Sequence, residues 1–264
     1  MRSLSFVIPA FNEESRLGPT LAAIVDYIKQ ESLTAEILVV DDGSHDRTAE
    51  LVENFARDHS MVRLVRNGKN RGKGYSVCHG VMEAAGNIII VTDADLAVPI
   101  EQCRKLVRAL DFGFDIAIGS RTLDQRLQRV KPPFYRRICS LAFRAMVRML
   151  LALHFEDTQC GFKAFSSEAA KRTFAMQKIE GWGFDPEILL IASLLGFRIK
   201  EIPVETFHRE GSKINLVRDS ARMFMELLAI RRRVFAEVTN LSPVAVSTVL
   251  PVTEEVATNE AEAA

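Results

Sequence analysis

Two aspartates two positions apart, Asp93 and Asp95, carry the clearest chemistry of this sequence. They follow residues 88–91, four consecutive β-branched apolar residues that predict a strand buried on both faces of a sheet. In an extended segment, residues i and i+2 face the same side, so both carboxylates can point toward one ligand. Carboxylate oxygens suit Mg²⁺ or Mn²⁺. The alternative is that both aspartates only form the turn at the strand end.

A second polar stretch, residues 70–74, combines glycines with the cations Arg71 and Lys73. Glycine allows close approach of the backbone, and the two cations can bind a phosphate-bearing ligand. The alternative is a plain loop that leads into a helix. Together with the aspartates, this stretch favours a divalent ion that bridges protein carboxylates and a diphosphate.

Strands alternate with helices along the first half of the chain, which predicts an α/β fold with a mainly parallel central sheet flanked by helices. We expect strands at residues 4–8, 36–40, 62–65, 88–91 and 115–119, and helices at 17–30, 46–56 and 75–85. Ligands of such sheets bind outside the carboxyl ends of the strands. The polar clusters fall there, at Asn12 and Glu13, at Asp41 and Asp42, at the aspartate pair and at residues 119–121.

The composition limits the class of protein. The chain has 264 residues with 48% hydrophobic content, enough for one large domain, and its 34 basic and 34 acidic residues give no argument for a nucleic-acid partner. Its four cysteines form no CxxC pair, which indicates reduced thiols and a cytoplasmic protein. No GxGxxG, GxxxxGK[ST], GxSxG or HExxH motif is present, which disfavours dehydrogenases, P-loop NTPases, serine hydrolases and zinc proteases.

Five motifs in order resemble the inverting family-two glycosyltransferases of the GT-A fold. They are PAFNEE at 9–14, DDGS at 41–44, NRGKG at 70–74, DAD at 93–95 and GSR at 119–121. Three later motifs are similar to the polyprenyl-phosphate branch, which includes dolichyl-phosphate glucosyl- and mannosyltransferases: DTQCGFK at 157–163, GWGFDPE at 181–187 and EGSK at 210–213. The resemblance covers roughly residues 4–225.

The resemblance implies a role for each matching position. The nucleotide sugar would be held by Pro9, Phe11, Glu13, Asp41, Asp42, Lys73 and Asp93, and the metal by Asp93 and Asp95. The catalytic candidates are Asp157, Arg121 and Lys213, and the phosphate or acceptor contacts are Arg136, Arg137, Arg209 and Ser212. Asp157 would act as a base or as a carboxylate that orients an arginine. Two departures are Ala97, where some relatives have a glutamine metal ligand, and Thr206, where many have tryptophan.

The predicted reaction is transfer of a hexose, glucose from UDP-glucose, to a polyprenyl or dolichyl phosphate, with Mg²⁺ or Mn²⁺. A phosphate acceptor is already anionic, so positioning and charge neutralisation matter more than a base. The alternatives are a GDP-mannose donor, a soluble acceptor, or a non-catalytic protein that binds nucleotide sugars. The sequence does not indicate an oligomeric state.

Residues 134–155 predict a basic amphipathic helix. Arg136, Arg137, Arg144 and Arg148 fall in one sector about 120° wide, while most other positions are apolar. Such a helix can lie in a membrane interface or pack on the sheet. Residues 214–237 predict a second such helix within a domain at 1–240, and 241–264 a flexible tail. No apolar stretch is long enough to span a bilayer, so we expect peripheral attachment at the cytoplasmic membrane face.

Overall fold

The computed structural model describes residues 2–128, 134–207 and 216–240. Its centre is a seven-stranded sheet in the order β3-β2-β1-β4-β6-β5-β7. The strands are β1 Ser3–Ala10, β2 Thr34–Asp41, β3 Val62–Arg66, β4 Ile88–Val91, β5 Ile116–Ser120, β6 Lys163–Ser166 and β7 Ile199–Pro203. β6 runs antiparallel to β4 and β5, and the other pairings are parallel. The predicted α/β architecture with a mainly parallel sheet is therefore confirmed, with β6 and β7 as additions.

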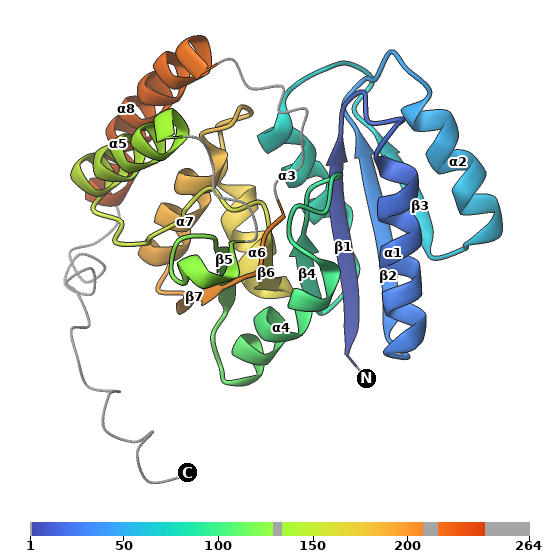
Figure 1. The fold of residues 1–264 in the computed structure, drawn as a ribbon. Coiled ribbons are helices and arrows are strands. Elements are labelled where there is room, and N and C mark those ends of the chain that lie inside the picture. The colour runs from blue at the N-terminus through green and yellow to red at the C-terminus, as the bar shows by residue number, and fades with distance from the viewer. Residues whose placement is uncertain (1, 129–133, 208–215, 241–264) are drawn as a thin grey trace, which may run out of the picture.

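Helices cover both faces of the sheet (Figure 1). One face carries α1 Leu17–Gln30, α2 Thr48–Asp58 and α4 Cys103–Asp111, and the other carries α3 Lys73–Glu83, α6 Ser167–Ala175 and α7 Phe184–Leu194. Short 3₁₀ turns lie at Ile100–Gln102 and Gln125–Leu127. Alternate residues of each strand enter opposite cores, as Phe6 and Val7 of β1 do. The central strands β4 and β5 are buried on both faces, and all or nearly all of their residues are apolar.

Two long helices, α5 Phe134–Leu151 and α8 Leu216–Asn240, lie side by side at one end of the domain (Figure 1). Each has a buried side, represented by Val147 of α5 and Leu227 of α8, which join the core around α6 and α7. Both helices thus pack on the domain along one side. No helix in the described parts of the chain is long and apolar enough to cross a membrane.

The carboxyl ends of four parallel strands define one edge of the sheet. β1, β2, β4 and β5 end there, and one of the predicted polar clusters lies at or directly after the end of each. Because β6 runs in the opposite direction, it begins at this edge, which brings residues 157–163 to the same place. The sheet therefore gathers segments that are far apart in the sequence.

Candidate functional site

Asp93 and Asp95 stand at the end of β4, as predicted. Lys73 Nζ donates to Asp93 Oδ1 at 2.6 Å, and the backbone N–H of Ala97 donates to Asp95 Oδ1 at 3.0 Å. Arg16 Nη1 lies 4.0 Å from Asp95 Oδ2. Both carboxylates are half-buried, so each has one side that a ligand can reach.

The two carboxylates have opposite electrostatic surroundings. Burial opposes ionisation of Asp93, but the adjacent Lys73 ammonium keeps its pKa below the ordinary aspartate value. The pKa of Asp95 is raised, first by burial and then by the negative charge of Asp93. The fold thus holds two like charges together, an arrangement that a divalent cation stabilises.

These residues fit Mg²⁺ or Mn²⁺ with two protein ligands. Within the described residues, no group of three His, Cys, Asp or Glu side chains is arranged to hold a metal. Mg²⁺ commonly uses one or two carboxylates and completes its shell with water and phosphate oxygens. Ala97 adds no side-chain ligand, and its carbonyl accepts a hydrogen bond from the Phe207 backbone. Asp93 and Asp95 would therefore share the ion with the ligand's own phosphates.

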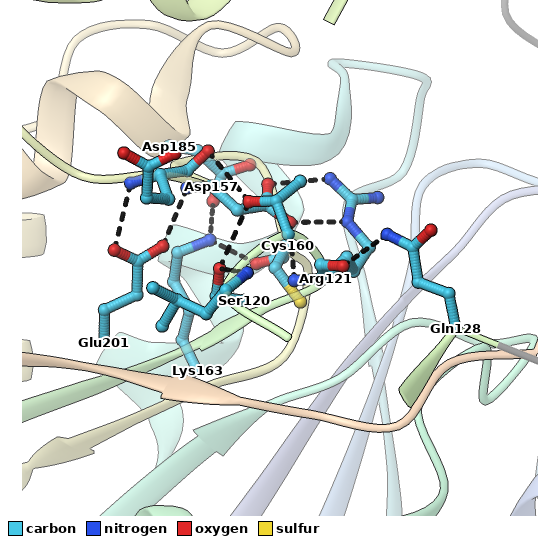
Figure 2. A network of polar contacts seen from close by, with 11 residues as sticks. Ser120, Arg121, Gln128, Asp157, Cys160, Lys163, Asp185 and Glu201 are labelled. Carbon is cyan, nitrogen blue, oxygen red and sulfur yellow. Dashed lines mark hydrogen bonds and ion pairs between the residues drawn. The ribbon is translucent and has the colours of Figure 1, made fainter. Parts of the chain in front are cut away.

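Arg121 and Asp157 form a bidentate ion pair beside this edge (Figure 2). Arg121 Nε donates to Asp157 Oδ2 at 2.7 Å, Nη2 donates to Oδ1 at 2.8 Å, and the Arg121 backbone N–H also donates to Oδ2. Although Asp157 is buried, the guanidinium keeps its pKa below the ordinary value. The backbone N–H of Asp157 donates in turn to Glu201. This is the geometry of a carboxylate that orients an arginine.

The two glycines of residues 70–74 lie against another segment of the same chain, residues 179–181. A β-carbon on Gly72 would lie 2.5 Å from the Glu180 carbonyl oxygen, and one on Gly74 would lie 2.6 Å from the carbonyl oxygen of Ile179. Arg71 forms an ion pair with Glu180. Of the two predicted phosphate cations, Lys73 therefore points to the aspartate pair, while Arg71 joins this loop to residues 179–181.

Asp42 organises the same loop from the end of β2. Its Oδ1 accepts from Asn67 Nδ2 at 2.8 Å and from the Arg71 N–H at 2.9 Å, and its Oδ2 accepts from the Gly72 N–H at 2.8 Å. Asp41 Oδ1 accepts only a long hydrogen bond from the Ser44 backbone among the contacts described. The two neighbouring aspartates therefore have different surroundings.

The loops after β1 and β2 are joined by hydrogen bonds. Asn12 has a left-handed backbone, with φ of 54°, and its N–H donates to Ser44 Oγ at 2.9 Å. Glu13 accepts two hydrogen bonds of 2.7 Å from Arg16, and the ring of Phe11 meets His45 edge-on. Pro9 lies within β1, opposite Val40. The candidate nucleotide contacts are thus brought together at one rim.

The structure describes the predicted phosphate and acceptor contacts only in part. Arg136 and Arg137 lie in the first turn of α5, where the structure describes the backbone but not their side chains. Arg209, Ser212 and Lys213 lie outside the described residues.

Lys163 and Asp185 are two charged residues of this edge for which the sequence predicted no role of their own. Lys163 Nζ donates to Asp185 Oδ1 at 2.6 Å in the middle of the network of Figure 2. Lys163 ends the motif at 157–163, and Asp185 lies in the motif at 181–187. A lysine next to apolar strand residues was the sequence signal that could have indicated a buried ion pair.

Two solved structures illustrate how widely this architecture is shared. Mannosyl-3-phosphoglycerate synthase from Rubrobacter xylanophilus superposes with a TM-score of 0.67 at 17% identity, covering 93% of this chain and 78% of that one. Glucosyl-3-phosphoglycerate synthase from Mycobacterium tuberculosis gives 0.65 at 20% identity, covering 88% and 81%. At these identities the likeness establishes the fold, and the predicted GT-A fold is confirmed.

Sequence comparison identifies closer relatives. A dolichyl-phosphate beta-glucosyltransferase of Trichomonas vaginalis is 36% identical over 239 residues, 86% of this chain and 72% of the relative. The dolichyl-phosphate beta-glucosyltransferase of Homo sapiens is 34% identical over 245 residues, 88% of this chain and 76% of the relative. The model of the family "Glycosyl transferase family 2" matches residues 5–174. The chain therefore belongs to glycosyl transferase family 2.

Proposed function

We propose that this protein transfers glucose from UDP-glucose to dolichyl phosphate or a related polyprenyl phosphate, with inversion at the anomeric carbon. The observation that carries the proposal is the pair Asp93 and Asp95 at the same sheet edge as Arg121, in a chain whose relatives are dolichyl-phosphate beta-glucosyltransferases. That edge combines carboxylates that can bind a metal with the Arg121 guanidinium, which Asp157 holds in place and which can bind phosphate. The chemistry fits a diphosphate leaving group and an anionic acceptor.

Asp93 and Asp95 would hold Mg²⁺ or Mn²⁺ on the diphosphate of the donor. The bound ion would neutralise the charge that develops on the leaving nucleoside diphosphate. The M. tuberculosis synthase has been solved in complex with Mn²⁺, UDP and phosphoglyceric acid. In this chain, Lys73 holds Asp93 at its Oδ1, and Pro9, Phe11, Glu13 and Asp41 are proposed to contact the nucleotide.

Arg121 is proposed to bind phosphate, with Asp157 as its positioning residue. Asp157 fixes one edge of the guanidinium in bidentate geometry, while the Arg121 side chain stays partly exposed at the sheet edge. Both Asp157 oxygens are engaged by Arg121, and an anionic acceptor needs no proton removed. Arg136, Arg137, Arg209, Ser212 and Lys213 remain predictions for further phosphate contacts.

The paired helices α5 and α8 are proposed to rest on the bilayer that carries the acceptor. Among the side chains that the structure describes, the exposed large apolar ones are Ile138, Leu141 and Met149 of α5, and Phe224 and Met225 of α8. A row of exposed apolar side chains flanked by arginines is typical of an interfacial helix. Arg144 and Arg148 both form ion pairs with Glu156, so the apolar residues carry this proposal instead of those two arginines.

The decisive experiment supplies dolichyl phosphate in vesicles, Mn²⁺, and radiolabelled UDP-glucose or GDP-mannose in parallel. Labelled lipid from UDP-glucose alone is the expected result. Product from GDP-mannose alone would show that the donor is GDP-mannose and not UDP-glucose. In a parallel reaction with a soluble acceptor in place of the vesicles, product there alone would show that the acceptor is not a lipid phosphate. Binding of UDP-glucose with no product from any combination would leave the non-catalytic alternative and contradict the proposal.

A further inference from the structure

Lys163 and Asp185 form a buried ion pair with no part in the reaction proposed above. Their side chains are 2% and 5% exposed, and the Nζ to Oδ1 distance is 2.6 Å. Lys163 begins β6 and Asp185 lies in the first turn of α7. The ion pair therefore joins the motifs at 157–163 and 181–187, which are separate in the sequence.

Lys163 also forms a hydrogen bond to the turn that precedes its own strand. Its ammonium donates to the Cys160 carbonyl oxygen as well as to Asp185. Between Cys160 and Lys163 stands Gly161, and a β-carbon there would lie 2.2 Å from Asp93 Oδ2. The backbone of this turn thus rests directly on one oxygen of the metal-site carboxylate, while Lys73 holds the other.

Packing alone does not call for a charged pair at this place. Removal of two charges from water costs several kcal/mol per ion, and apolar side chains of similar volume often fill such sites with equal or better stability. The surroundings offer another reason. The Lys163 ammonium binds the Cys160 carbonyl oxygen, next to the turn at Gly161 that packs against the Asp93 carboxylate.

We propose that Lys163, held by Asp185, is a positioning residue that fixes the turn at Gly161 against Asp93 and so orients the Asp93 carboxylate toward the metal. The inference rests on the proposed function in taking Asp93 as a metal ligand. Loss of the ammonium would release the Cys160 carbonyl and let the turn move away from Asp93. Partners that hold a metal ligand in place typically contribute 10- to 100-fold, roughly, to metal affinity.

The test measures Mn²⁺ binding in the presence of UDP by electron paramagnetic resonance, without turnover. Lys163→Met should weaken Mn²⁺ binding by about 10-fold or more. The double variant Lys163→Met with Asp185→Leu removes both charges, so it should recover thermal stability and still bind Mn²⁺ weakly. A purely structural role of Lys163 would restore Mn²⁺ affinity together with thermal stability in the double variant. A positioning role would restore thermal stability alone.

A matched control is Arg233→Met, which breaks the ion pair between Arg233 and the buried Glu187. Glu187 is two residues after Asp185 on α7, about 200° around the helix and hence on its opposite side. This variant should lose thermal stability and keep wild-type Mn²⁺ affinity.

Wild-type Mn²⁺ affinity in the folded double variant would overturn this inference alone. If Lys163→Met does not fold, the double variant gives the answer. A wild-type protein that binds no Mn²⁺ with UDP would overturn both the metal role in the proposed function and the inference that rests on it. In steady-state assays, Lys163→Met should need a higher Mn²⁺ concentration and have a lower kcat than wild type, with an unchanged KM for dolichyl phosphate.

Discussion

Gly161 and Asp93 are in direct contact, so close that a β-carbon on Gly161 would lie 2.2 Å from Asp93 Oδ2. The two residues are 68 positions apart and meet because β4 and β6 are antiparallel neighbours. One strand supplies the carboxylate, and the turn before the other strand supports it. The glycine is therefore required by the position of the Asp93 side chain and not by its own backbone angles.

Gly161→Ala should abolish most metal-dependent binding of UDP. No β-carbon fits at that distance, so either the Asp93 carboxylate or the turn must move, and we expect Mn²⁺ affinity with UDP to fall at least about 10-fold. Isothermal titration calorimetry measures the change. Gly18→Ala in α1 is the control, since its β-carbon would lie at an ordinary 3.7 Å from Leu51 of α2. Unchanged affinity in Gly161→Ala would contradict the proposed support of Asp93.

Asp95→Asn should remove transfer activity without loss of stability. Removal of a metal ligand should lower kcat by about 100-fold or more. The pKa of Asp95 is raised by burial and by Asp93, so its charged form is disfavoured in the folded state, and neutralisation should leave Tm unchanged or higher. Differential scanning fluorimetry should show that Mn²⁺ with UDP raises the Tm of wild type only. A variant with wild-type activity would refute the metal role.

The ion pair between Arg121 and Asp157 predicts a pH dependence of stability. Because Arg121 keeps the folded-state pKa of Asp157 below the unfolded value of about 3.9, the contribution is fully present above that value. It is lost as the pH falls through the folded-state pKa. Wild type should thus be more stable than Asp157→Asn in urea at neutral pH, by an amount that shrinks below about pH 4. A difference that stays constant to pH 2.5 would argue against the pair as its source.

The proposed bilayer surface predicts that charged substitutions on α5 and α8 prevent vesicle binding. Leu141→Asp and Met225→Asp change side chains that are 58% and 64% exposed, so the fold should tolerate both. Cosedimentation with anionic vesicles should fall several-fold for the double variant. Phe112→Asp, at a side chain that is 69% exposed but lies next to α4, is the control that should bind as wild type does. Equal binding by all three proteins would exclude these helices as the contact surface.

Local patterns predicted much of this protein. The β-branched run at Ile88–Val91 and the aspartates after it predicted a buried strand with two carboxylates at its end, and the structure has this strand, with Asp93 bound to Lys73 just beyond it. Helices lie at both places where the sequence predicted amphipathic ones. Such features depend on neighbouring residues and on the periods of helix and strand, which a single sequence shows directly.

The sequence by itself determined the α/β class, the sheet edge where polar residues gather, and the resemblance to family-two glycosyltransferases, because motifs and periodicity are local. Only the tertiary structure decided which charges pair. It placed Asp157 on Arg121, Glu180 on Arg71, and Asp185 on Lys163. Each of these partners is more than 20 positions away in the chain, and an ion pair over that separation depends on strand order and direction, which the composition of neither segment specifies.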